Sequence, residues 1–155
     1  MIAYTDGATF GKTRTGEPSP IGAGAVFHRD DFQPRDEPLH TICESLGKGT
    51  SNDAEWLALI LAVEWWLTET GASRLVVRSD SQLIVNQAKK NWVVNKSNLQ
   101  DHAKRFFYLK KVARKMNRRV DVEWVPREMN KHADKISKAA ASLAADTVGL
   151  GPPDA

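Results

Sequence analysis

The segment Ile2-Ala3-Tyr4-Thr5-Asp6-Gly7 decides how the rest of the chain is arranged, because it is a short β-prone stretch that ends in an acid and a glycine. Such a stretch predicts a strand that carries a carboxylate to its tip. Taken alone, Asp6-Gly7 is more typical of a turn that closes a hairpin. Three later segments each place another acid at the start of a helix. The alternative to a turn is therefore that Asp6 and these three acids meet at one site.

The composition is that of a soluble single-domain protein. The chain has 155 residues, of which 41% are hydrophobic and 26% charged. A chain of this length and composition can form a hydrophobic core without disulfides or structural metal ions. No apolar run reaches the roughly 20 residues of a membrane span, and the N-terminus lacks the pattern of a signal peptide, so we expect a cytoplasmic protein. Cys43 is the only cysteine, which excludes an intrachain disulfide and a cysteine-based zinc cluster.

Hydrophobic periodicity predicts three strands and then alternating helices and strands. Strands are expected at 2–7, 21–27, 40–46, 74–80 and 120–125. Helices are expected from 52 to a stop at 71, and at 81–90, 99–117 and 131–145. Short connections favour an antiparallel meander for the first three strands, and a crossover helix places the fourth parallel to the first. We therefore predict a mixed five-stranded α/β sheet with helices on its faces, in one domain over residues 1–146, followed by a disordered tail at 147–155.

The acids that begin the helices also have purely structural explanations. Asn52 is a favourable N-cap, and Glu55 stands at the spacing of its capping-box partner. Asp80 or Ser81 can cap the helix that follows them, and Asn130 can cap the last helix. Capping explains each residue singly but does not explain why the pattern recurs.

Asp6, Glu55, Asp80 and Asp134 are nevertheless all expected at the same end of the sheet, where the carboxyl ends of parallel strands form sites. Clustered carboxylates repel one another unless cations neutralise them, which disfavours a packed structural role. Since cysteine ligands and zinc-like histidine spacing are absent, the hard oxygen ligands suit Mg²⁺ or Mn²⁺. Two such ions about 3.5–4 Å apart can activate a water and stabilise the leaving oxygen in phosphodiester cleavage.

Cations gather in one stretch, although the net charge is only +3. They are Lys89, Lys90, Lys96, Lys104, Arg105, Lys110, Lys111, Arg114, Lys115, Arg118 and Arg119, interrupted by the single acid Asp101. A solvated helix face and a phosphate-binding surface both account for such a run. The sequence leaves the choice between them open.

The order of the motifs resembles that of type 1 ribonucleases H over nearly the whole chain. The matching motifs are Tyr4-Thr5-Asp6-Gly7, the glycine-bearing strand at 21–27, Thr50-Ser51-Asn52-Asp53-Ala54-Glu55, Ser79-Asp80-Ser81-Gln82 and Asn130-Lys131-His132-Ala133-Asp134. The resemblance implies the strand order 3-2-1-4-5 with strand 2 antiparallel. It also implies metal-dependent endonucleolytic cleavage of the RNA strand of an RNA/DNA hybrid, leaving a 3′-hydroxyl and a 5′-phosphate, by a protein that we expect to be a monomer.

The resemblance assigns roles to particular residues. The four acids, Asp6, Glu55, Asp80 and Asp134, would hold two metal ions, and Glu55 would also touch a 2′-hydroxyl. Implied substrate contacts, mostly along the minor groove where 2′-hydroxyls are displayed, are Gly7, Ala8, Asn52, Gln82 and Asn130. Trp92 stands where family members can set an aromatic ring against a sugar of the DNA strand, although a packing role explains it equally.

Two departures from the family pattern matter. The connection from 124 to 130 is short and lacks the histidine that many members carry, as in the shorter-loop branch; Arg127, Glu128 and His132 are candidate substitutes, and His132 is expected on the helix surface. The segment 91–98 is too short for a basic protrusion. In some family members this protrusion is an extra helix and loop that contacts phosphates of the DNA strand. Here we expect those contacts from Lys89, Lys90, Lys96, Lys104 and Arg105 instead.

Two other functions remain open. A resolvase or exonuclease of the same superfamily is disfavoured by Asn52 and Gln82, which serve recognition of the hybrid's minor groove. A non-catalytic nucleic-acid-binding module, or a regulatory subunit of a polymerase, is disfavoured by the presence of all four acids. The sequence leaves the metal preference, the biological hybrid and any sequence preference undetermined.

Overall fold

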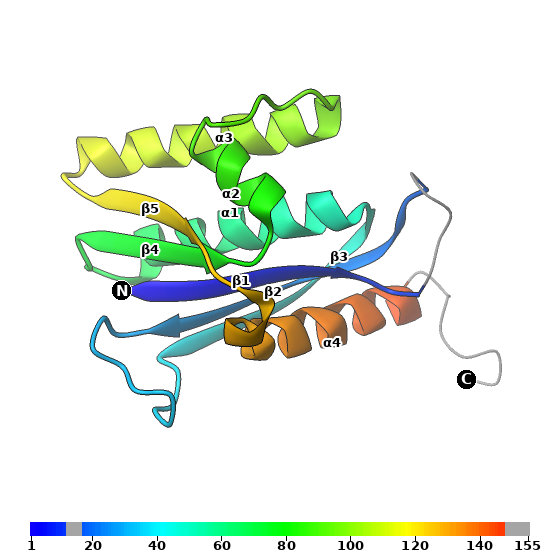
Figure 1. The fold of residues 1–155 in the computed structure, drawn as a ribbon, viewed down its shortest axis with the longest axis horizontal. Coiled ribbons are helices and arrows are strands. Elements are labelled where there is room, and N and C mark those ends of the chain that lie inside the picture. The colour runs from blue at the N-terminus through cyan, green and yellow to red at the C-terminus, as the bar shows by residue number, and fades with distance from the viewer. Residues whose placement is uncertain (12–16, 148–155) are drawn as a thin grey trace.

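The computed structural model describes residues 1–11 and 17–147, which form a mixed sheet flanked by helices (Figure 1). The strands are β1 (Ile2–Thr9), β2 (Ser19–His28), β3 (His40–Gly49), β4 (Arg74–Ser79) and β5 (Arg119–Trp124). The helices are α1 (Ser51–Glu69), α2 (Gln82–Ala88), α3 (Ser97–Lys115), the 3₁₀ turn η1 (Arg127–Met129) and α4 (Lys131–Thr147). Of the predicted tail, Thr147 belongs to α4 and residues 148–155 lie outside the described part of the chain.

The sheet has the predicted strand order, β3-β2-β1-β4-β5. β2 pairs antiparallel with both β1 and β3, whereas β4 pairs parallel with β1 and β5. In the parallel pair Thr5 lies opposite Ser79. The next residues, Asp6 and Asp80, therefore lie side by side where β4 ends. Asp6 is not at the tip of its strand, as the sequence predicted, because β1 continues to Thr9 in its pairing with β2.

Two helices cover opposite faces of the sheet at β1 (Figure 1). Successive strand residues point to opposite faces. A Cβ built on Gly7 would lie 2.3 Å from the backbone of Ala54 in α1, whereas the side chain of Asp6 contacts Ser137 in α4. The Asp6–Gly7 part of β1 is thus held between α1 and α4.

The glycines of β2 allow α4 to approach the sheet closely. A Cβ on Gly22 would lie 2.2 Å from the backbone nitrogen of Ala141. α4 turns a row of small buried side chains toward the sheet, Ala133, Ser137, Ala140, Ala141, Ala144 and Ala145. Because neither partner carries bulk at the contact, the backbones of α4 and β2 pack almost directly against each other.

Large side chains fill the other face, between the sheet, α1 and α3. Trp56, Trp66, Phe27 and Phe106 are fully buried there. The indole Nε1 of Trp56 donates a hydrogen bond to Gln87 across 3.0 Å, which ties α1 to α2. Within the described ranges, no helix combines the length and apolar character that crossing a bilayer requires.

The start of α1 differs from the prediction made from the sequence. Thr50 is the N-cap: its hydroxyl accepts a hydrogen bond from the backbone N–H of Asp53 across 3.2 Å, and the Asp53 carboxylate accepts one from the Thr50 N–H across 2.9 Å. The predicted capping box of Asn52 and Glu55 is therefore wrong. Because β3 continues to Gly49, the chain enters the helix two residues earlier, and the carboxylate of Glu55 is left free to face β1.

Candidate active site

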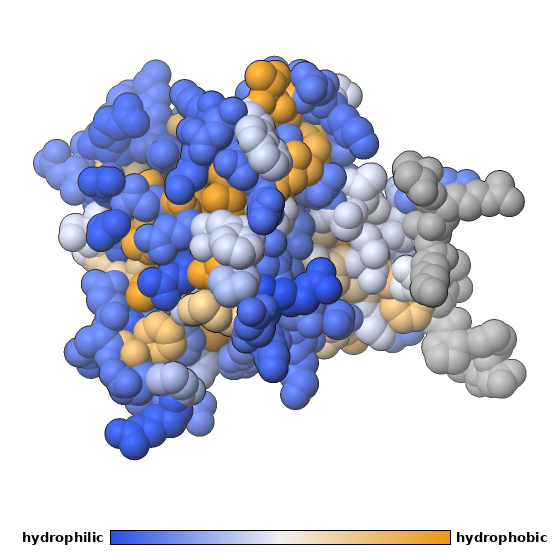
Figure 2. Space-filling view, viewed as in Figure 1, coloured by the Kyte–Doolittle hydropathy of each residue, from blue (hydrophilic) through white to orange (hydrophobic). Residues whose placement is uncertain are grey.

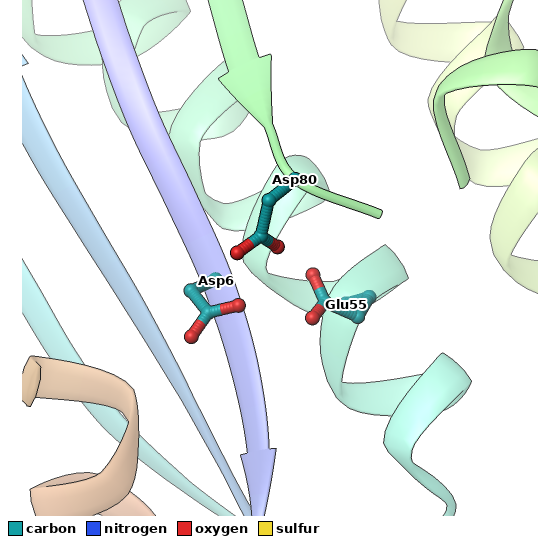
Figure 3. Close-up of side chains that lie close together, drawn as sticks. All are labelled: Asp6, Glu55 and Asp80. Carbon is teal, nitrogen blue, oxygen red and sulfur yellow. The ribbon is translucent and has the colours of Figure 1, made fainter. Parts of the chain in front are cut away.

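Three carboxylates meet where β1, β4 and α1 converge (Figure 3). Asp6 comes from β1, Asp80 directly follows β4, and Glu55 lies in α1. One oxygen of each carboxylate lies within 4.8 Å of those of the other two. The parallel register of β1 and β4 brings the two aspartates together, and the missing side chain of Gly7 lets the helix deliver Glu55 beside them.

The side chain of Asp80 is available to the site because a neighbouring residue caps the helix that follows. The following helix, α2, is capped by Ser81, whose hydroxyl accepts a hydrogen bond from the Ile84 N–H across 3.3 Å. The indole Nε1 of Trp124 donates to the Asp80 carbonyl across 3.3 Å. Of the two residues that the sequence offered as caps, Asp80 and Ser81, Ser81 is the N-cap of α2.

Burial and like charges make this cluster electrostatically costly. Burial, with the negative charge of Asp80, raises the pKa of Asp6 to about 6, while hydrogen bonds from Glu55 and Ser137 oppose the rise. Burial also raises the pKa of Glu55 well above its usual value, assisted by the charge of Asp6. One oxygen of Glu55, Oε2, is buried without a hydrogen-bond partner. Over residues 1–11 and 17–147, no lysine or arginine forms an ion pair with any of the three acids.

Asp134 faces the same cavity but stands apart from the close trio. It lies in the first turn of α4 and forms an ion pair with Lys138 across 2.9 Å. Burial acts to raise its pKa, but the hydrogen bonds with Lys138 and Asp6 and the charges of Lys138 and Arg127 together outweigh burial, so the pKa of Asp134 is lowered. The fourth acid is therefore ionised and partly neutralised by the protein itself.

The cavity in front of the acids has a volume of about 400 Å³. Its lining comprises Asp6, Gly7, Ala8, Thr9, Ser51, Asn52, Glu55, Asp80, Ser81, Arg127, Asp134 and Lys138. Three predicted substrate contacts, Gly7, Ala8 and Asn52, thus share the cavity with all four acids. Gln82 is exposed at the first position of α2, next to the lining residue Ser81.

The remaining predicted contacts do not line this cavity. Trp92 is 47% exposed between α2 and α3 and is not part of the core, and Lys89, Lys90 and Lys96 are exposed on the same segment. Asn130 is 1% exposed. Its Nδ2 donates to the carbonyl of Thr5 across 2.8 Å, while its Oδ1 has no partner, so the side chain supports β1 and does not cap α4. A hydrogen bond from the same side chain to Asp80 acts to lower the pKa of that carboxyl.

Sequence reasoning missed two residues that act on the acids and left a third undecided. Ser137 donates a hydrogen bond to Asp6, a contact between distant segments that no local pattern could reveal. Lys138 stands four residues after Asp134, a spacing that could have predicted their ion pair. Among the candidate substitutes for the loop histidine, Arg127 lines the cavity and its charge lowers the pKa of Asp80 against the larger effect of burial. Glu128 and His132 are exposed and line a different cavity.

Comparison with known proteins identifies the family of the chain. Residues 10–140 match the model of the family described as reverse transcriptase-like. The bifunctional protein Rv2228c of Mycobacterium tuberculosis is 32% identical over 132 residues, covering 85% of this chain and 34% of that protein. Ribonuclease HI of Halobacterium salinarum is 32% identical over 142 residues, covering 89% of this chain and 62% of that protein. The chain therefore spans about a third of the mycobacterial relative and less than two thirds of the archaeal one.

Solved structures with the same fold extend the comparison. The N-terminal RNase H domain of Rv2228c aligns with a TM-score of 0.76 at 28% identity, over 95% of this chain and 96% of that one. LC11-RNase H1, solved in complex with an RNA/DNA hybrid, aligns with a TM-score of 0.72 at 29% identity, over 92% of this chain and 97% of that one. The five-stranded order and the flanking helices are those of the RNase H-like fold.

Proposed function

The chain belongs to the reverse transcriptase-like family, as a type 1 ribonuclease H, and on this premise we propose that it cleaves the RNA strand of RNA/DNA hybrids endonucleolytically by a two-metal-ion mechanism. The products would carry 5′-phosphate and 3′-hydroxyl ends. The observation that carries the proposal is the trio of Asp6, Glu55 and Asp80, delivered to one point by three different elements. The structure of LC11-RNase H1 with an RNA/DNA hybrid supports the choice of substrate.

The donor set fits divalent cations. Three carboxylates within 4.8 Å of one another, one of them with a buried oxygen that lacks any partner, offer hard oxygen ligands and little else, as Mg²⁺ and Mn²⁺ prefer. Burial and mutual repulsion raise the pKa of both Asp6 and Glu55. A cation would remove that repulsion and restore the carboxylate form, so the same residues that destabilise the empty cluster favour the loaded one.

Asp6, Glu55, Asp80 and Asp134 are the residues that would hold two ions. When bound, the ions would lower the pKa of a water and offset the negative charge that develops on the departing oxygen. The Lys138 ion pair and the Ser137 hydrogen bond keep Asp134 and Asp6 in fixed orientations. The chain thus supplies positioning and charge, which dominate catalysis of phosphoryl transfer.

Discrimination of RNA would come from residues along one side of the cavity. The backbone of Gly7 and Ala8 and the side chain of Asn52 line the cavity beside the acids. Together with Gln82 at the start of α2, they would contact the RNA strand through the minor groove, where 2′-hydroxyls are displayed. Glu55 would contact a 2′-hydroxyl next to the cleaved bond, which DNA lacks.

The experiment that tests the proposal compares the purified protein on an RNA/DNA hybrid, on duplex RNA and on duplex DNA, with Mg²⁺ or Mn²⁺. We expect cleavage of the hybrid alone, confined to its RNA strand and abolished by EDTA. Cleavage of duplex DNA would favour a resolvase or exonuclease of the same superfamily. Binding of the hybrid without cleavage under any metal would favour a non-catalytic module.

A further inference from the structure

One carboxylate, that of Asp53, joins the start of α1 to the start of α3, and it lies two residues before Glu55. We propose that Asp53 is a positioning residue for recognition of the hybrid: it fixes the spacing between the residues that would contact the RNA strand and the α2–α3 loop, residues 89–96, whose Trp92 would contact the DNA strand. This inference rests on the proposed function for its substrate. It assigns to Asp53 an effect on the affinity for the hybrid and none on the chemical step.

Both oxygens of the Asp53 carboxylate are engaged, each with a different helix. Oδ2 accepts hydrogen bonds from the backbone N–H and from the hydroxyl of Thr50, both across 2.9 Å, and thereby completes the capping box of α1. Oδ1 accepts a hydrogen bond from Nδ2 of Asn98 across 2.8 Å and lies 2.9 Å from Nε2 of His102. One side chain therefore caps α1 and holds α3 at the same time.

The start of α3 depends on this partner. Within the described chain, the N-cap of α3, Lys96, makes no capping hydrogen bond through its side chain. Asn98 and His102 are four residues apart, so they lie on one face of the helix, and a carboxylate near a helix N-terminus also interacts favourably with the helix dipole. The side chains of Asp53 and His102 are only 14% and 21% exposed. Asp53 thus supplies, from α1, the anchor that the first turn of α3 lacks.

The start of α3 in turn holds the loop that precedes it. Nε2 of Gln100 donates hydrogen bonds back to the carbonyls of Val94 and Asn95, across 3.0 and 3.4 Å. Trp92, in the same loop, is about half exposed. Figure 2 shows hydrophobic atoms at the surface in the region where Figure 1 places this loop. The end of the loop nearer α3 is therefore positioned by the first turns of that helix.

Asp53 also stands beside the residues on the RNA side of the site. Asn52 lines the active-site cavity, and Glu55 belongs to the close trio of acids. A duplex that contacts Asn52 with its RNA strand and Trp92 with its DNA strand has to match the spacing between the two. B-form DNA has a minor groove about 6 Å wide, whereas A-form duplexes have a wide, shallow one. A fixed spacing therefore favours one duplex shape over others.

A second polar contact between the same two helices offers an internal comparison. Arg105 of α3 donates hydrogen bonds from Nε and Nη2 to one oxygen of Glu64 in α1, both across 3.2 Å. Glu64 follows Glu55 by about 14 Å along α1, at roughly 1.5 Å per residue, and does not line the active-site cavity. A purely stabilising role would make the two contacts equivalent. A positioning role makes only the contact of Asp53 matter for the hybrid.

The test removes both α3 partners of Asp53, with Asn98→Ala and His102→Ala combined. This change leaves the capping box of α1 intact and removes no lysine or arginine, so none of the expected phosphate contacts is lost. KM and kcat are measured on a hybrid of about 20 base pairs, roughly two helical turns, with saturating Mg²⁺. We expect KM to rise on the order of tenfold, as for the loss of one aromatic contact with the nucleic acid, while kcat changes little.

Glu64→Ala is the matched control, because it breaks the other contact between α1 and α3 and keeps every cation. It should leave KM unchanged. Asn98→Ala with His102→Gln returns one hydrogen-bond donor to Asp53 and should recover most of the affinity. In an Asp53→Ala background the double alanine change should raise KM no further, because its partner is already gone.

A wild-type KM in the double alanine variant would overturn the inference, as would an equal rise in Glu64→Ala. A further rise in the Asp53→Ala background would show that Asn98 and His102 contact the hybrid directly, and it would overturn the inference too. Asn98→Ala alone, at an exposed position, replaces the double variant if thermal unfolding shows the latter to be unfolded, with a smaller rise expected.

The proposed function is judged separately, by whether the unmodified chain cleaves the hybrid. If the chain cleaves it and the variants behave as wild type, the function stands and the positioning role fails. If the chain binds the hybrid without cleaving it, the dissociation constant takes the place of KM in the same comparisons. Absence of both cleavage and binding would overturn both proposals.

Discussion

The hydroxyl of Ser137 in α4 donates a hydrogen bond to Oδ2 of Asp6 in β1, across 2.9 Å. Ser137 is fully buried, and the same hydroxyl lies 2.9 Å from the carbonyl oxygen of Asp134. It therefore connects the two elements that carry these acids. Its hydrogen bond opposes the rise in the pKa of Asp6 that burial causes.

Replacement of Ser137 by alanine should impair the acid cluster without unfolding the protein. Loss of the donor leaves the Asp6 carboxylate less well oriented, and residues that orient metal ligands in this way typically contribute about 10- to 100-fold to metal affinity or activity. We expect the concentration of Mg²⁺ needed for half-maximal cleavage to rise by at least about tenfold, with the KM for the hybrid little changed.

The control for Ser137 is Ser45→Ala. Ser45 donates a hydrogen bond to the Ala140 carbonyl of the same helix across 2.8 Å but does not contact an acid. It should leave the metal dependence unchanged. Equal metal dependence of the Ser137 variant and the wild type would show that this hydrogen bond does not support the ligands.

Gly7→Ala tests the close approach of α1 to β1. The added methyl would lie 2.3 Å from the backbone of Ala54 and Glu55, so the helix start must move, at a cost of about 1–3 kcal/mol or more in the free energy of unfolding. Displacement of Glu55 should lower kcat by up to roughly 100-fold. Denaturant unfolding and cleavage assays measure the two effects.

Gly71→Ala is the matched control for Gly7, because a Cβ at Gly71 meets nothing within 4 Å. Its free energy of unfolding should stay within about 0.5 kcal/mol of the wild type. If Gly7→Ala were as stable and active as this control, the packing explanation for Gly7 would be refuted.

Strand periodicity and parallel pairing were sufficient to predict the mixed five-stranded sheet and the convergence of the acids, whereas the strand order 3-2-1-4-5 came from the resemblance to type 1 ribonucleases H. The sequence was insufficient for the start of α1, where Thr50–Asp53 and Asn52–Glu55 both have capping-box spacing. The choice depends on where β3 ends, at Gly49, which is a tertiary matter. Contacts such as Ser137 with Asp6 join residues far apart in the chain, and periodicity carries no information about them.

The cations illustrate the same limit. One run of lysines and arginines fits both a solvated helix face and a phosphate-binding surface. Only the fold shows that Arg118 donates hydrogen bonds to the carbonyls of Trp66, Leu67, Thr70 and Ala72 and stacks on Trp66, with 4.2 Å between the guanidinium carbon and the ring centroid. Arg118 therefore stabilises the last turn of α1. Its charge alone did not reveal whether it serves the fold or a phosphate-binding surface.

Arg118→Lys should destabilise the protein without affecting hybrid binding. A lysine keeps the charge but cannot span several carbonyls with a planar group, and the loss of charged hydrogen bonds should cost on the order of 2 to 4 kcal/mol in the free energy of unfolding. Arg119→Lys, at a residue whose ion pair is exposed, should cost under about 0.5 kcal/mol. Urea unfolding of both variants measures these two costs. Equal stability of the two variants would refute the structural assignment of Arg118.

Trp92→Ala separates a substrate contact from a packing role. The side chain is 47% exposed, so the free energy of unfolding should barely change, while loss of an aromatic contact with the nucleic acid should raise KM on the order of tenfold. Tyr108→Ala, at a 57% exposed position on α3, serves as the control with unchanged KM. A lower melting temperature with unchanged KM would instead assign Trp92 to packing.

The central claim is that the clustered acids are metal ligands for RNA cleavage, and Asp80→Asn tests it most directly. Asparagine keeps the shape of the side chain but removes the charge of a residue that lies within 4.8 Å of Asp6 and Glu55 in the cluster. The measurement is the rate of RNA-strand cleavage in an RNA/DNA hybrid with saturating Mg²⁺ or Mn²⁺, together with hybrid binding and thermal unfolding of the same preparation. We predict that cleavage is abolished while folding and binding persist; appreciable turnover by the purified variant would contradict the assignment.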